Sequence, residues 1–328
     1  MADLGTTYLG MRIANPVVVA ASGLVSNING VEKAARAGAG AITLKSLFEE
    51  QIEAEVAAAE SSLPPGANSE AAEYLRGMGL HAGANDYLAL IRGAKQAVGV
   101  PVVASVNCAA GPWWTEFASQ IESAGADALE LNIGFVPLDG SESAEKIEDR
   151  VVSIVRDVRA ATRLPLAVKL GPDWTNLNHL APRLVEAGAR ALVLFNRFYR
   201  LDLDLDAMKL KSGPTKAGSE DYHETLRWIG MLDGRLRDAE LVAGNGVRDA
   251  ETALRLVASG ASAVQVCSLL YEKGYDAIGG LARAMSARLD ALGLKDLKSL
   301  RGRLSRRMSE KPEAWGRAQY VQALTGIS

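Results

Sequence analysis

The chain has 328 residues, of which 48% are hydrophobic, with 32 glycines, 11 prolines and a formal net charge of −3. A chain of this size can form one large α/β domain, and the lack of a long basic run argues against nucleic acid or an anionic membrane as a partner. Only Cys108 and Cys267 and three scattered histidines are present, so we expect no disulfide framework, iron–sulfur centre or metal site. No apolar run approaches the length of a membrane span and no signal segment opens the chain, so we expect a cytoplasmic protein.

Taken in chain order, eight short apolar segments start near residues 15, 41, 101, 128, 166, 191, 241 and 263. Four of them contain an Ala/Ser-Gly-Ala-x-Ala pattern, which begins at Ala37, Ala124, Ala187 and Ser259. In this pattern a helix ends at the glycine, and small residues let that end pack closely on a sheet. Eight apolar strands separated by helices predict a closed parallel (β/α)8 TIM barrel, with a doubly wound open sheet as the alternative. Because no linker interrupts the pattern, we expect residues 1–328 to form a single domain.

Two long insertions follow the second and sixth predicted strands. The first, Leu47–Val100, contains an Ala/Glu-rich helical segment at Glu49–Glu60. The second, Arg197–Glu240, begins with an alternation of leucine and aspartate over Leu201–Asp206, which predicts an extra strand, and a helix over Tyr222–Leu236 follows. Both insertions follow strand carboxyl ends, where barrel enzymes place their sites, and long loops there commonly form lids.

The chain ends in a charged helical tail. A last helix is predicted from Ala277 onward, and the charged segment Arg301–Arg317 follows it. Its simplest interpretation is a face exposed to solvent.

The stretch from Leu241 to Ser268 contains two strands, each of which ends in small residues. Its first strand breaks into Gly244-Asn245-Gly246, and a helix follows with Asp249 as its predicted N-cap. The helix ends at Gly260, and the second strand stops at Cys267-Ser268. In a (β/α)8 barrel the loops after strands 7 and 8 can hold a phosphate on backbone N–H groups. Two tight turns of an ordinary α/β protein remain the alternative.

Polar residues stand at the predicted carboxyl ends of all eight strands. They are Ser22, Lys45, Ser46, Asn107, Asn132, Lys169, Asn196, Gly244 to Gly246, Cys267 and Ser268. Lys169 lies in an otherwise apolar strand, and burial of such groups is costly unless something compensates them. An anionic ring or a phosphate would satisfy the lysines, and the amides suit a ligand edge that both donates and accepts. An internal network, in which these side chains satisfy one another, is the alternative.

The chain resembles the dihydroorotate dehydrogenase superfamily of FMN-containing barrels, and more closely its branch of dihydroorotate dehydrogenase-like proteins. The similar segments are NPVVVAASGL (15–24), TLKSLFEEQI (43–52), ASVNC (104–108), ALELNI (128–133), PLAVKLGP (165–172), LVLFNRFYRLDLDLD (192–206), LRWIGMLDGR (226–235) and AGNG (243–246). They span nearly the whole chain, and as a set they are specific.

The resemblance implies an FMN site. Residues Ala21, Ser22 and Gly23 would pass under the flavin ring, with Lys45 and Ser46 beside it. Lys169 would sit at the N1/O2 edge and stabilise the charge of the reduced ring. Asn107, Asn132 and Asn196 would bind flavin or substrate edges, and Gly244, Asn245, Gly246, Cys267 and Ser268 would hold the phosphate.

Three positions depart from the family pattern. The loop after the fourth strand carries Phe135 where the dehydrogenases have a Cys or Ser base. Arg76 replaces the asparagine of the segment that grips orotate, and Asn245 replaces the second glycine of the phosphate loop. We therefore expect Lys45, Lys169 and Cys108 to be the catalytic residues. Cys108 is the first candidate to replace the missing base, followed by Tyr199, His81 and Asp139.

These features predict an FMN-dependent oxidoreductase acting on a CH–CH bond of a small, pyrimidine-like substrate, as in pyrimidine biosynthesis. Its electrons would pass to a soluble acceptor or to a separate electron-transfer protein, and analogy with the family predicts a homodimer. The alternatives are a Schiff-base aldolase that uses Lys169 and a flavin-binding protein without dehydrogenase activity. A flavin-dependent tRNA reductase would need a basic surface, which a net charge of −3 does not suggest.

Overall fold

The structure, a computed structural model, describes residues 1–50, 85–107, 111–134, 136–197, 201–213, 218 and 220–326. At its centre lie eight parallel strands: β3 (Val17–Val19), β4 (Ala41–Thr43), β6 (Val102–Asn107), β7 (Ala128–Ile133), β8 (Leu166–Leu170), β9 (Ala189–Leu194), β12 (Glu240–Ala243) and β13 (Ala263–Val266). Each begins within two residues of its predicted start.

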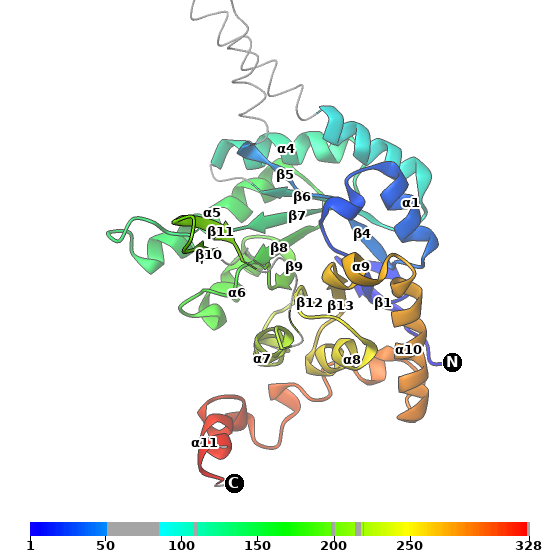
Figure 1. Cartoon of the computed structure of the whole chain (residues 1–328), viewed down its shortest axis with the longest axis vertical. Coiled ribbons are helices and arrows are strands. Elements are labelled where there is room, and N and C mark those ends of the chain that lie inside the picture. The colour runs from blue at the N-terminus through cyan, green and yellow to red at the C-terminus, as the bar shows by residue number, and fades with distance from the viewer. Residues whose placement is uncertain are drawn as a thin grey trace, which may run out of the picture.

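These strands close into a barrel (Figure 1). Neighbours pair in the order β3, β4, β6, β7, β8, β9, β12, β13, and the pairing of β13 with β3 completes the ring. A two-residue strand, β5 (Leu47–Phe48), extends the sheet beside β6. The predicted TIM barrel is therefore confirmed, and the open-sheet alternative is wrong.

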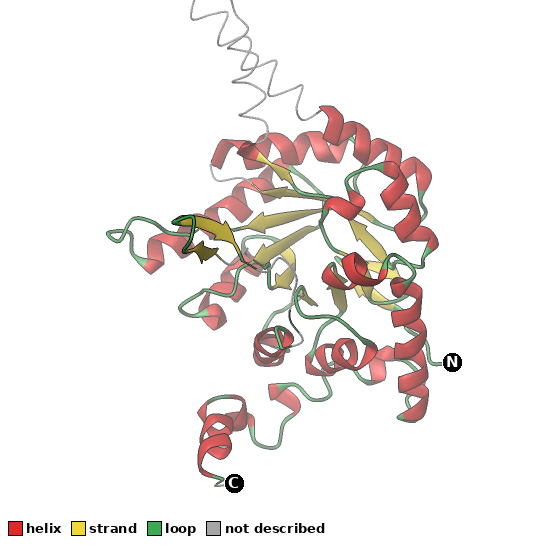
Figure 2. Cartoon of the chain, viewed as in Figure 1, coloured by secondary structure: helices red, strands yellow, loops and turns green. Residues whose placement is uncertain are grey.

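Helices surround the barrel strands, as Figure 2 shows, and the last helix, beside the carboxyl terminus, lies apart from the barrel. They are α1 (Ile28–Arg36), residues 85–97, α4 (Gly111–Ser123), α5 (Ala144–Ala161), α6 (Leu177–Glu186), α7 (Tyr222–Leu232), α8 (Ala250–Ser259), α9 (Ser268–Lys273), α10 (Ala277–Ala291) and α11 (Arg317–Thr325), with short 3-10 turns at Gly23–Val25, Leu297–Ser299, Arg306–Met308 and Pro312–Trp315. The predicted limits of α8 are confirmed, because Asp249 accepts a bond from the N–H of Thr252 at 2.8 Å and Gly260 ends the helix with φ +135°. Across the described residues, none of these helices has the length and apolar character needed to span a membrane.

The amino-terminal hairpin plugs the lower end of the barrel, a feature that the sequence analysis missed. Strands β1 (Thr6–Tyr8) and β2 (Met11–Ile13) are antiparallel, and their two-residue turn has φ +55° at Leu9 and +78° at Gly10. Inside the barrel, this hairpin packs in one cluster with small side chains of the strands: Val18, Ala41, Val103, Ala128, Ala167, Ala191, Val193, Val242 and Ala263. Because five of these are alanines, the barrel has room for Tyr8 and Leu9, which are 0% and 1% exposed.

The insertion after β9 forms a hairpin rather than a single strand. Strand β10 (Leu201–Asp204) pairs with β11 (Lys209–Ser212), so the predicted strand exists but its partner was missed. Helix α7 ends at Leu232, four residues before the predicted Leu236, because Asp233 leaves the helical conformation and Gly234 has φ +77°. In the insertion after β4, residues 51–84 lie outside the described residues, so most of the predicted helix at Glu49–Glu60 stays a prediction.

Much of Arg301–Arg317 is exposed, as expected, but the expectation of a solvent-exposed face is wrong at Arg301, Gly302 and Ser305, where the tail packs on the barrel helices. Arg301 is largely buried, which lowers its pKa, and its guanidinium donates to the carbonyl of Gly260 at 3.3 Å. The backbone N–H groups of Gly302 and Leu304 donate to carbonyls in the last turn of α8, at 3.0 and 2.9 Å. Carbonyls at a helix end need such partners, and the tail provides them.

We expect the ring of Tyr8, but not its hydroxyl, to stabilise the fold. Tyr8→Ala would leave a cavity among small residues and lower the free energy of unfolding by about 3–5 kcal/mol. Tyr8→Phe would cost little, because the buried hydroxyl lies near Thr43 and Gln265 but forms no hydrogen bond of normal geometry among the described residues. Urea unfolding of the two variants measures the difference, and a large loss in Tyr8→Phe would contradict this assignment.

Candidate active site

Closure of the barrel brings the carboxyl ends of its strands to one rim, and the predicted site residues follow those ends. Ala21, Ser22 and Gly23 follow β3; Lys45 and Ser46 follow β4; Asn107 ends β6; Asn132 and Lys169 lie near the ends of β7 and β8; Asn196 follows β9; Gly244, Asn245 and Gly246 follow β12; and Cys267 and Ser268 follow β13. Residues from all eight strands are thus brought to one face, which we call the rim.

Lys169 is buried below the rim and is held by two side chains. Its Nζ donates to Gln265 Oε1 at 3.0 Å and lies 3.7 Å from Glu130 Oε1. Gln265 Nε2 in turn donates to Glu130 Oε2 at 2.6 Å. An ammonium has three N–H groups, and Gln265 is its one hydrogen-bond acceptor within the described ranges. Lys169 therefore combines a fixed position with donors left over for a ligand.

Glu130 and Gln265 belong to an inner polar layer that sequence reasoning missed. The layer comprises Thr43, Ser105, Glu130, Lys169 and Gln265, each at most 6% exposed. The hydroxyl of Tyr8 approaches it from below, and burial, followed by the charge of Glu130, raises the pKa of that phenol. The signal was available, because Glu130 precedes Asn132 by two residues and so faces the same side of β7.

A second set of contacts runs from β6 to the rim. The hydroxyls of Ser46 and Ser105 are 2.8 Å apart, and the Tyr87 hydroxyl both donates to the Ser105 carbonyl and accepts from its N–H. Asn196 Nδ2 donates to Asn132 Oδ1 at 2.8 Å. The predicted alternative of an internal network is thus partly realised, but it leaves polar atoms of both amides and the half-buried Lys45 at the rim.

The loop after β12 is shaped by two glycines that have no room for a side chain. A Cβ on Gly246, whose φ is +75°, would lie 2.4 Å from the backbone nitrogen of Tyr222 at the start of α7. A Cβ on Gly244 would lie 2.9 Å from the carbonyl oxygen of Phe195. The loop therefore exposes backbone rather than side chains next to the end of β13, with which β12 is paired.

The end of β13 places the thiol of Cys267 near the charge of Lys169 and near the Ser22 hydroxyl that follows β3. Burial raises the pKa of Cys267, while the charge of Lys169 and the Ser22 hydroxyl act in the opposite direction. The Ser22 Oγ is buried close to the Cys267 thiol, but the two do not reach hydrogen-bond geometry, and no other partner for this hydroxyl is found among the described residues. The raised pKa keeps Cys267 a neutral thiol at physiological pH, so it offers the rim no anionic nucleophile.

Three of the four residues predicted for proton transfer are not placed by the structure. Cys108, Tyr199 and His81 lie outside the described residues, as does Phe135 at the position of the missing base, so these assignments stay predictions. The remaining candidate, Asp139, is exposed and accepts bonds from the N–H and hydroxyl of Ser141, which lower its pKa. A carboxylate stabilised in this way is a weak base, so Asp139 is a poor candidate.

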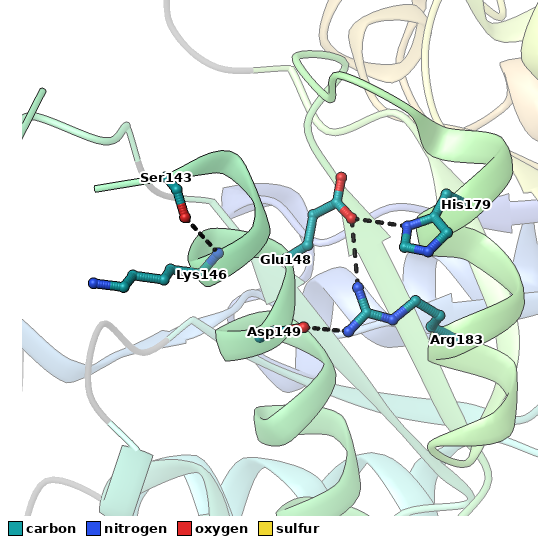
Figure 3. A network of polar contacts seen from close by, with 6 residues as sticks. All are labelled: Ser143, Lys146, Glu148, Asp149, His179 and Arg183. Atoms are coloured by element: carbon teal, nitrogen blue, oxygen red, sulfur yellow. Dashed lines mark hydrogen bonds and ion pairs between the residues drawn. The ribbon is translucent and has the colours of Figure 1, made fainter. Parts of the chain in front are cut away.

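A cavity of about 200 Å³ lies outside the rim, between the loops that follow β7 and β8. Figure 3 shows the polar cluster at its border, where Glu148 of α5 contacts His179 and Arg183 of α6 at 3.2 and 3.5 Å. Arg183 also pairs with Asp149, and Ser143 caps α5 through the N–H of Lys146. These contacts fasten α5 to α6 and so anchor the loop after β7 beside β8.

Comparison with known proteins identifies a family. The chain matches the dihydroorotate dehydrogenase family over residues 3–289, a range that includes every barrel strand. The catalytic subunit of dihydroorotate dehydrogenase B (NAD(+)) from Methanocaldococcus jannaschii is 26% identical over 287 residues, covering 83% of this chain and 89% of that protein.

Two further relatives carry similar names. The corresponding catalytic subunit from Methanocella arvoryzae is 27% identical over 80% of this chain and 85% of its own length. A provisionally named dihydroorotate dehydrogenase A (fumarate) from Aeropyrum pernix is 31% identical over 62% of this chain and 67% of its own length.

We expect Gly246→Ala to destabilise the protein more than Gly274→Ala does. Both glycines have φ +75°, but a Cβ on Gly274 would meet nothing within 4 Å. The strain of positive φ is therefore common to both variants. The clash with Tyr222 should lower the free energy of unfolding of Gly246→Ala by about a further 1–3 kcal/mol. Urea unfolding measures the difference. An equal decrease in the free energy of unfolding of the two variants would show that the loop can move to accommodate the Cβ.

Proposed function

Because the chain belongs to the dihydroorotate dehydrogenase family, we propose that it is an FMN-dependent oxidoreductase acting on a CH–CH bond of a small, pyrimidine-like substrate. The observation that carries the proposal is the ammonium of Lys169, which is buried at the rim end of β8 with donors left over for an anionic ligand. A barrel that bound nothing there would hold a buried cation for no compensating gain beyond the one carboxylate beside it.

The residues at the rim fit FMN. The loops after β12 and β13 follow paired strands, and glycine excludes side chains from the first of them. The N–H of Gly244 donates to the carbonyl of Leu194, so we expect the donors to a phosphate to come from the rest of that loop and from the end of β13. The buried Ser22 hydroxyl without a partner among the described residues, and the Lys169 ammonium, suit the polar edge of the ring. When bound, FMN supplies a two-electron acceptor for a hydride.

Each group at the rim would then have a role set by its position. Lys169 would hold negative charge at the ring edge, and Lys45 and Ser46 would lie beside the ring. Asn107, Asn132 and Asn196 would orient the ring or a substrate with amide donors and acceptors. Gly244, Asn245, Gly246, Cys267 and Ser268 would surround the phosphate, with Ala21, Ser22 and Gly23 beneath the ring.

The electron acceptor is proposed from the relatives. Two of them are named catalytic subunits of NAD(+)-linked enzymes, and one is named for fumarate. We therefore expect either a soluble acceptor or a separate electron-transfer protein, and a homodimeric catalytic unit.

The first test is flavin binding and the effect of Lys169 on the flavin. We expect the chain to bind FMN and to show its visible absorbance. Lys169→Met would lower the equilibrium constant for two-electron reduction about 10- to 100-fold, about 30–60 mV, because a buried positive charge is lost. Spectroelectrochemical titration measures the shift.

Lys209→Met is the matched control, because Lys209 is exposed in β11 and its loss should leave the potential unchanged. A chain that takes up no FMN would overturn the proposal. Glu130 beside Lys169 is the kind of carboxylate neighbour that an aldolase would use, which the sequence analysis did not expect. Borohydride trapping of a carbonyl compound on Lys169 would establish that alternative instead.

The second test concerns dihydroorotate. Its oxidation removes a hydride from one carbon and a proton from the next, and a positioned base contributes about 10²–10⁴ to the rate. Because Phe135 cannot accept a proton, we expect slow turnover of dihydroorotate and a gain of up to that factor in Phe135→Cys. Steady-state assays with several acceptors measure both.

Cys108→Ala is assayed alongside. A lower turnover rate in this variant than in the unmodified chain would identify Cys108 as the substitute base. If the unmodified chain turns over dihydroorotate rapidly and Cys108→Ala does so equally fast, the base lies elsewhere.

A further inference from the structure

The inner polar layer holds a carboxylate that the proposed function leaves unexplained. Glu130 is 0% exposed in the middle of the barrel, where an uncompensated charge is costly. Its Oε2 accepts from Gln265, but its Oε1 has no hydrogen-bond partner among the described residues. The nearest cation to that oxygen is the ammonium of Lys169, at 3.7 Å. The two charges therefore depend on each other.

Gln265 links Lys169 to Glu130 by hydrogen bonds that run in one direction. Its carbonyl oxygen accepts from Lys169 and its amide nitrogen donates to Glu130, so the hydrogen-bond chain runs from cation to anion. Reversing the amide would set its NH₂ against an ammonium and its oxygen against a carboxylate. The amide is thus fixed in one orientation, and it fixes one N–H of Lys169 in turn.

The strand register puts Glu130 on the far side of Lys169 from the rim. Lys169 is paired with Asn132, whereas Glu130 is paired with Ala167, nearer the amino ends of the strands. A ligand at the rim would therefore meet the ammonium and not the carboxylate. Tyr8 and the small side chains of the barrel floor close the space from below and keep water out.

We propose that Glu130, acting directly and through Gln265, is the positioning residue that keeps Lys169 charged and aimed at the rim. This inference rests on the proposed function for the role of Lys169. Its physical basis is geometric. In the part of the chain that the structure describes, Glu130 is the buried counter-ion of this ammonium, and removing that charge would favour the neutral amine.

The experiment is trace acetylation of the full chain, without FMN, followed by peptide mapping. Acetic anhydride reacts only with the neutral amine, and the exposed Lys209 serves as an internal reference. We expect Glu130→Gln to raise the relative labelling of Lys169 at least about tenfold, since the ammonium loses its counter-ion. Glu130→Asp keeps the charge and should restore labelling to near that of the unmodified chain.

Glu240→Gln is the matched control for general loosening of the barrel. Glu240 is also a buried barrel glutamate, 7% exposed, but its contact in the structure is the N–H of Gly10 rather than Lys169. Two outcomes would overturn the proposal and leave Glu130 a purely structural residue. In one, Glu130→Gln leaves the labelling of Lys169 unchanged; in the other, Glu240→Gln raises it equally.

A double-mutant cycle keeps the proposal testable if Glu130→Gln is unstable. If the two charges support each other, Glu130→Gln and Lys169→Met together should reduce the folding equilibrium constant by less than the product of the two single effects. Additive effects would contradict the proposal. Neither measurement requires flavin, so a failure to bind FMN would overturn the proposed function without deciding this one.

Discussion

Closure of a parallel sheet is the constraint on which the rest of this structure depends. Pairing of β13 with β3 and of β4 with β6 leaves the eight barrel strands without a free edge, and it gathers their carboxyl ends at one rim. Side chains that are far apart in the chain, such as Lys169 and Gln265, can then touch inside the ring. In a flat sheet β8 and β13 would be held apart by β9 and β12, whereas the curvature of the closed ring turns their inner side chains toward each other.

The interior of the ring is divided by polarity. Its lower part is apolar and made of alanine and valine, which admits the hairpin that carries Tyr8 and Leu9. Its middle part is the inner polar layer, in which one buried lysine, one buried glutamate and one amide compensate one another. A pair of opposite charges in such a setting contributes little net stability, because each charge gives up its hydration. Its value lies in holding an ammonium at a defined place below the rim.

The loops at the rim depend on packing outside the ring. Gly246 can adopt its conformation only because it has no side chain to collide with the first residue of α7. The end of α8, which begins just beyond that loop, is completed by N–H groups of the tail at Gly302 and Leu304. Packing outside the ring therefore restricts the loop at Gly246, while the tail completes the opposite end of α8.

The sequence by itself determined the strands, their order and the rim, because apolar runs and Ala-Gly-Ala junctions are local patterns that repeat eight and four times along the chain. It also identified Lys169, since a single charge within an apolar strand stands out. It did not reveal what compensates that charge. The partners, Glu130 and Gln265, lie 39 residues before it and 96 after it. Pairing of β7 with β8 brings Glu130 beside Lys169, and the curvature of the closed barrel brings in Gln265 from β13. The amino-terminal plug and the docking of the charged tail were decided in the same way, since both depend on space and on unpaired carbonyls that exist only once the barrel and its helices have formed.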